Sequence, residues 1–73
     1  MRTVVYHTPM YDIIKSRKME NGVAVYYNEG GQEKFESFNY SELIDMRINA
    51  LDVLDDPKNY SVDKANHRLI MKK

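Results

Sequence analysis

The sequence predicts a small α+β fold: a mostly antiparallel β-sheet of about four to five strands with one α-helix, over about residues 41–55, packed on one face. Two observations support it. β-rich runs precede and follow a single stretch of helical periodicity, and turn-forming residues separate these segments. With 73 residues and no linker or internal repeat, we expect a single domain over residues 1–73.

Two strands are predicted in the N-terminal part of the chain. A short β-branched run over residues 3–6 ends before Pro9, and residues 11–17 form a second run. The Glu-Asn-Gly segment at residues 20–22 is predicted to be the turn that follows the second strand.

A tight hairpin is the clearest local prediction. Adjacent glycines at 30–31 lie between β-rich runs at 23–27 and 33–38, and glycine tolerates the positive φ that hairpin turns require. In this register Tyr26 faces Phe35, so apolar side chains lie on both faces of the sheet. We expect one face to meet the core and the other to be covered or exposed. The remaining predicted pairs are Ala24 with Ser37, Val23 with Phe38, Val25 with Glu36 and Tyr27 with Lys34.

The helix is predicted to begin near Ser41, where Asn39 and Glu42 can form a capping box, and to end before Pro57. Its apolar positions share one broad arc. They are Leu43, Ile44, Ile48, Ala50, Leu51 and Leu54, widened by Met46 and Val53. The opposite ridge is acidic and polar, and consists of Glu42, Asp45, Asn49, Asp52 and Asp56.

A second hairpin is predicted at the C-terminus. Residues 60–62 and 68–71 are its predicted strands, with Tyr60 and Val62 on one face of the first and Leu69 and Met71 on one face of the second, and residues 63–67 between them are typical of a turn.

Charge is segregated along the chain although the formal total is zero. Residues 1–28 hold four basic and two acidic side chains, residues 29–56 two and eight, and residues 57–73 five and one. This layout is unlike that of a uniformly basic nucleic-acid binder or a wholly acidic DNA mimic.

Groups suited to catalysis or metal binding are scarce. There is no cysteine, and His7 and His67 have no Ser or Asp at a spacing typical of a catalytic set. Asp52, Asp55 and Asp56 lack the ligand spacing of a calcium loop. We therefore expect a protein that is not an enzyme, with no metal and no cofactor.

The sequence shows neither a signal peptide nor an apolar run near the ~20 residues that a membrane helix needs. We expect a cytoplasmic protein with no membrane partner. Frequent Asn, Lys, Tyr and Ile suit an AT-rich phage or bacterial genome.

Two features allow a binding role. Arg47 falls within the apolar arc of the predicted helix, where its guanidinium either pairs with a sheet carboxylate such as Glu36 or anchors a partner. Six tyrosines exceed what so small a core can absorb, although strand propensity explains several of them.

The leading hypothesis is a non-enzymatic protein-binding module, a small phage or mobile-element protein that binds and modulates or inhibits another protein. Its acidic helix face would meet a basic surface, and surplus apolar surface would favour a homodimer. The predicted contact residues are Tyr26, Tyr27, Glu42, Asp45, Arg47, Asp52, Asp55 and Asp56.

The alternative is a small nucleic-acid-binding regulator. It would use two basic clusters, and it requires that these converge in space. The clusters are Lys15, Arg17 and Lys18, and Arg68, Lys72 and Lys73.

Overall fold

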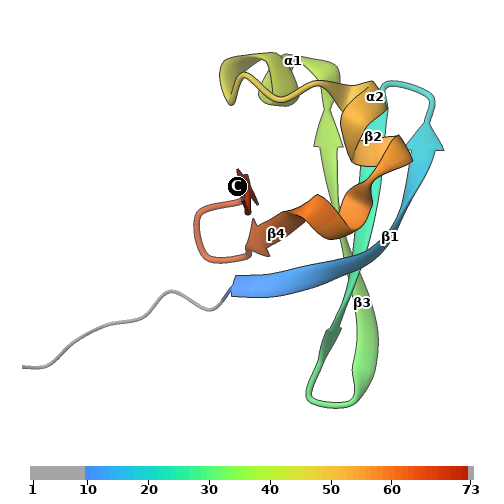
Figure 1. Cartoon of the computed structure of the whole chain (residues 1–73), viewed down its shortest axis with the longest axis vertical. Coiled ribbons are helices and arrows are strands. Elements are labelled where there is room, and N and C mark those ends of the chain that lie inside the picture. The colour runs from blue at the N-terminus through green and yellow to red at the C-terminus, as the bar shows by residue number, and fades with distance from the viewer. Residues whose placement is uncertain (1–9, 73) are drawn as a thin grey trace, which may run out of the picture.

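A computed structural model describes residues 10–72 of the chain. The strand predicted over residues 3–6, His7 and Lys73 lie outside the described residues. The described part forms a five-stranded antiparallel sheet with two short helices at one end (Figure 1), which confirms the predicted α+β class and both predicted hairpins.

The sheet has the strand order β3-β2-β1-β4-β5. Its strands are β1 (Met10–Met19), β2 (Gly22–Glu29), β3 (Gln32–Asn39), β4 (Tyr60–Asp63) and β5 (Arg68–Met71). The register of β2 and β3 matches the prediction at every pair, including Tyr26 with Phe35 and Val23 with Phe38. Gly30 and Gly31, at φ 60° and 83°, form the tight turn between these strands.

β1 belongs to two halves of the sheet. Its first residues, Met10 to Asp12, pair with β4, whereas Ile13 and the residues from Lys15 onward pair with β2. The register shifts between Ile13 and Lys15, which leaves Ile14 as an extra, exposed residue in a β-bulge. The bulge marks the place where the strand passes from one half of the sheet to the other (Figure 1).

The core lies on one side of the β1–β3 half of the sheet, and the helices and the β4–β5 hairpin contribute to it. Its members are buried apolar side chains from nearly every element. They are Ile13, Val23, Val25, Tyr27, Phe38, Leu43, Val53, Tyr60, Val62 and Leu69. Of the two apolar faces predicted for the β2–β3 hairpin, the face bearing Val23, Val25 and Tyr27 is therefore the buried one; we call the opposite side of β1–β3 the outer face.

The prediction of one helix over residues 41–55 is wrong, because two helices, α1 (Tyr40–Asp45) and α2 (Ala50–Asp55), occupy this stretch. The start of α1 is as predicted, with Asn39 and Glu42 forming the capping box. Its end is a Schellman motif: the Ile48 amide donates to the Leu43 carbonyl at 2.9 Å and the Arg47 amide to the Ile44 carbonyl at 2.9 Å.

Arg47 occupies the left-handed position of this motif, with φ 60°. The side chain therefore does not lie within the apolar arc of a continuous helix, as the sequence had suggested. Asn49 begins the next helix, since its side chain accepts a hydrogen bond from the Leu51 amide at 2.9 Å.

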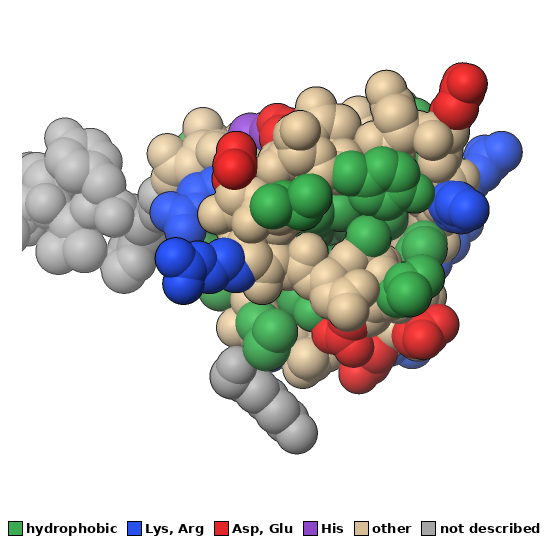
Figure 2. Space-filling view, turned by 90° about the horizontal axis from the view of Figure 1, so that it is seen from above, with side chains coloured by type: hydrophobic (Ala, Val, Ile, Leu, Met, Phe, Trp, Pro, Cys, Tyr) green, Lys and Arg blue, Asp and Glu red, His purple; other side chains and the backbone are tan. Residues whose placement is uncertain are grey.

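Because of this interruption, the predicted apolar arc does not form one buried stripe. Leu43 and Val53 are buried, but Ile44 and Leu51 are 72% and 69% exposed. Figure 2 looks onto this helix end and shows apolar side chains near its centre, with polar surface and acidic side chains around them.

Polar side chains join the helices and turns to the sheet. The Ser16 hydroxyl donates to the Val53 carbonyl of α2 at 2.8 Å, and the hydroxyl of the fully buried Tyr60 donates to Asp52. Burial and then the Asp52 carboxylate raise the pKa of Tyr60 to about 12. A 3₁₀ turn, η1 (Pro57–Asn59), connects α2 to β4.

Candidate protein-binding surface

The outer face carries an exposed pair of aromatic rings. Tyr26 of β2 and Phe35 of β3 are direct cross-strand partners, with ring centroids 5.8 Å apart. Phe35 is 58% exposed. Adjacent strands thus hold the two rings in contact without the cover that the core-side residues receive.

β1 adds basic and sulfur-containing side chains beside these rings. Lys15 pairs with Tyr26, and its ammonium lies 5.0 Å from the centre of the Tyr26 ring. Arg17 pairs with Ala24. Met19, two residues further toward the turn, lies on the same face.

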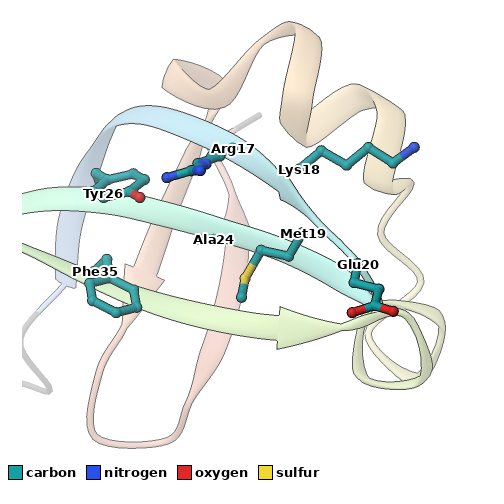
Figure 3. A pocket seen from close by; sticks show the side chains of 7 residues that line it. All are labelled: Arg17, Lys18, Met19, Glu20, Ala24, Tyr26 and Phe35. Atoms are coloured by element: carbon teal, nitrogen blue, oxygen red, sulfur yellow. The ribbon is translucent and has the colours of Figure 1, made fainter.

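A hollow of about 470 Å³ opens between these residues (Figure 3). Its lining consists of Arg17, Lys18, Met19, Glu20, Ala24, Tyr26 and Phe35. The small side chain of Ala24 helps to explain the depression, because on this face of β2 it lies between Tyr26 and Gly22 and leaves space that a larger residue would fill. Figure 3 shows Tyr26 and Phe35 at one end of the hollow and Glu20 at the other.

Charges surround this surface. Lys15 forms an exposed ion pair with Glu33 at 3.5 Å. Lys18 points away from the aromatic side chains toward the helices (Figure 3). The outer face therefore has aromatic and sulfur-containing residues near its centre and charges of both signs around them.

The first predicted basic cluster is divided by the sheet. Lys15 and Arg17 lie on the outer face, but Lys18 pairs with Val23 on the other side. In the second cluster, Lys72 lies 3.1 Å from Asp12, where it lowers the pKa of that carboxyl, and Arg68 is exposed. Two of the described lysines of these clusters are thus partly neutralised by carboxylates.

The predicted acidic helix face is only partly available. The Glu42 carboxylate accepts a hydrogen bond from the Asn39 amide and lies 3.2 Å from His67, and Asp52 accepts the Tyr60 hydroxyl. The other three predicted acids, Asp45, Asp55 and Asp56, are exposed.

Of the two predicted aromatic contacts, only Tyr26 is at the surface. Tyr26 lines the hollow, whereas Tyr27 is only 1% exposed and stacks on Tyr11 in the core, with centroids 5.1 Å apart. Tyr27 therefore has no surface to offer a partner. Phe35 and Met19 were not among the predicted contacts, although the predicted pairing of Tyr26 with Phe35 already placed these rings together.

His67, in the turn between β4 and β5, contacts residues of β3 and α1. Its ring stacks on Phe38, with centroids 4.2 Å apart, and its nitrogens lie 2.8 Å from Glu36 and 3.2 Å from Glu42. Glu36 therefore pairs with His67, and the predicted alternative, a pair between Glu36 and Arg47, is not observed. The contacts join the β4–β5 turn to β3 and α1.

A second charged cluster lies around Glu29. Lys64 at 2.9 Å, the Tyr11 hydroxyl at 2.9 Å and Lys34 at 3.2 Å all contact its carboxylate. They lower the pKa of Glu29 to about 2. Within residues 10–72, no three His, Cys, Asp or Glu side chains come together as a metal site would require.

No family model, curated protein or solved structure matches this chain. Among the described helices, none has the length and apolar character needed to cross a membrane. Functional inference therefore rests on the surfaces themselves.

Proposed function

We propose that this chain is a non-enzymatic protein-binding module that receives its partner on the outer face of β1–β3. The observation that carries the proposal is the exposed Tyr26–Phe35 pair beside the hollow. Burying a phenylalanine side chain is worth about 1.5–3 kcal/mol, and Phe35, at 58% exposure, leaves much of this unused.

The composition of the surface supports a protein partner. Aromatic residues, methionine and arginine are enriched in protein interfaces, and their centres are depleted of charge. Tyr26, Phe35, Met19 and Arg17 fit this description, and the Lys15–Glu33 pair lies at the rim.

The outer face suits the role better than the predicted acidic helix face. Two of the acids there already have partners inside the chain, because Glu42 contacts His67 and Asp52 accepts the Tyr60 hydroxyl. The proposal therefore keeps the predicted class of function but moves the contact to the sheet.

The geometry also supports a proposal for the partner's chemistry. An apolar side chain would fill the hollow above Ala24, and a carboxylate beside it would reach Arg17. We thus propose a protein segment with an apolar anchor next to an acidic residue, in place of the basic surface expected from the sequence.

Site-specific photo-crosslinking tests the proposal. A photoreactive residue at exposed Ser37, beside the hollow, should capture one protein in an extract of the cells that make this chain, whereas the same residue at Lys58 should not. Phe35→Ser should abolish capture. Ile44→Ser, which also removes an exposed apolar side chain, should leave it unchanged.

The captured protein, once purified, should bind the chain directly and lose affinity with Phe35→Ser. Capture that is equal at both probe positions, or that Phe35→Ser does not affect, would refute the proposal. Titration with a labelled single-stranded oligonucleotide checks the alternative. Binding that depends on Phe35 and weakens steeply with salt would indicate a nucleic-acid binder that stacks bases on Tyr26 and Phe35.

A further inference from the structure

We infer that the free edge of β3 pairs with the same strand of a second copy of this chain. β3 is an eight-residue strand at the end of the sheet order, and among the described residues it pairs with β2 alone. Such an edge presents unpaired backbone groups that can receive another strand. This inference goes beyond the proposed function and does not depend on it.

The hairpin determines which backbone groups point outward. Its two-residue turn makes Glu29 and Gln32 a hydrogen-bonded pair, and bonded and non-bonded pairs then alternate along the strands. Lys34 and Glu36 therefore bond to β2. Phe35, between them, directs its N–H and C=O toward the free edge.

One antiparallel register of two β3 strands is self-complementary. If Phe35 lies opposite Phe35 of the second copy, the outward-pointing groups of the two strands bond to each other. In the same register Lys34 lies opposite the second copy's Glu36, and the two-fold axis repeats this pair. Both side chains are then in non-bonded positions, where cross-strand neighbours are closest.

The neighbouring registers are disfavoured by charge. A shift that centres the pairing on Lys34 places Lys34 opposite itself, and a shift in the other direction places Glu36 opposite itself. Like charges directly opposite are destabilising. The charges of this edge thus favour the Phe35-centred register over the registers on either side of it.

Existing contacts are compatible with this arrangement. Lys34 lies 3.2 Å from Glu29, which keeps Lys64 at 2.9 Å, so Lys34 can turn to a new partner. The Glu36 oxygen Oε2 contacts His67 at 2.8 Å, and the other oxygen is left for the lysine of the second copy. The pair of copies would place two outer faces side by side, with the Phe35 rings adjacent at their junction.

Charge reversal tests the inference by sedimentation of the purified protein. We expect the unmodified chain to form a dimer, and Lys34→Glu or Glu36→Lys alone to weaken it about tenfold through repulsion at both symmetry-related pairs. An equimolar mixture of the two variants should restore the dimer, because each Glu then faces a Lys.

The mixture separates the proposed edge from damage within one chain, because mixing cannot repair a lost contact to Glu29 or His67. Lys58→Glu, an exposed charge outside the sheet, is the matched control and should leave the dimer intact. A monomer at the highest concentration that the protein tolerates would overturn the inference. So would a dimer that the single reversals leave unchanged, or a mixture that stays monomeric. Because Ser37 would lie close to the second copy in this arrangement, the mass of the cross-linked product must separate a captured copy of this chain, which reports on the edge, from a different protein, which reports on the proposed function.

Discussion

The hydrogen bond from Tyr60 to Asp52 provides a quantitative test of how α2 is held to the sheet. Tyr60 is fully buried at the start of β4, whereas Asp52 in α2 is half-buried. Tyr60→Phe removes the donor and keeps the ring. We expect it to lower the free energy of unfolding by about 1.5 kcal/mol, since a bond to a charged acceptor contributes about 1.5–3 kcal/mol and water can partly replace the donor at Asp52.

Asp52→Ala should cost more, about 2 kcal/mol, because it leaves the buried hydroxyl of Tyr60 without a partner. In the double variant no buried polar group is orphaned, so its loss should be smaller than the sum of the single losses. The exposed Asp55 of the same helix supplies the control, and Asp55→Ala should change stability by less than about 0.5 kcal/mol.

Urea and thermal unfolding followed by circular dichroism measure these differences. For a domain of this size, about 1.5 kcal/mol corresponds to a decrease in Tm of about 6–12 °C. An unchanged Tm for Tyr60→Phe, or strictly additive losses in the double variant, would refute the reasoning. Ultraviolet titration gives an independent check, because Tyr60, with its pKa raised to about 12, should ionise well above the value of about 10 for free tyrosine. This contribution to stability is present below pH 10 and is lost as the pH rises through about 12.

Three further predictions follow from single residues. Because the pKa of Glu29 is lowered from 4.5 to about 2, its contribution to stability is present above pH 4.5 and is lost as the pH falls through about 2. Glu29→Gln should therefore destabilise the protein at neutral pH but not near pH 2. Equal urea midpoints of the variant and the unmodified protein at neutral pH would contradict this. Gly22→Ala should prevent normal folding, because the new Cβ would overlap the Phe38 carbonyl oxygen. Gly30→Asn should be tolerated, since asparagine can adopt the φ of 60° at this position. A native-like Tm for Gly22→Ala would show that the strands can separate at Gly22. Arg47→Gly should raise the free energy of unfolding by about 0.5–1 kcal/mol by relieving a left-handed non-glycine residue, and a loss of stability would mean that the arginine side chain contributes more than its backbone costs.

The local structure could be predicted from the sequence wherever a single residue pattern determines it. Gly30-Gly31 and the flanking β-rich runs determine the register of β2 and β3, and Asn39 with Glu42 determines the start of α1. The interruption after Asp45 could not be seen in the same way. Arg47 and its neighbours are residue types that helices tolerate, so periodicity continues across a break that the Schellman motif creates.

The candidate surface was predictable only in part. The sequence indicated that the β2–β3 hairpin has two apolar faces, but alternation alone cannot show which face meets the core. That choice depends on what packs above the sheet, and it separates buried Tyr27 from its neighbour Tyr26. The hollow depends further on Met19 and Arg17 of β1, whose position beside β2 is a property of the strand order.

The division of β1 between two partners has a consequence for how the protein is made. Strands β1 to β3 are contiguous in the chain, so they can associate early during synthesis. Residues 10–12 must wait for residues 61–63, which are synthesised much later than β1 to β3. Until then, the edge of β1 and the aromatic rings of Tyr11 and Tyr27 lack their cover, and the nascent chain is most vulnerable to aggregation. Slow translation of the residues between β3 and β4 would prolong that interval, whereas a chaperone that shields the first strands would reduce the risk of aggregation.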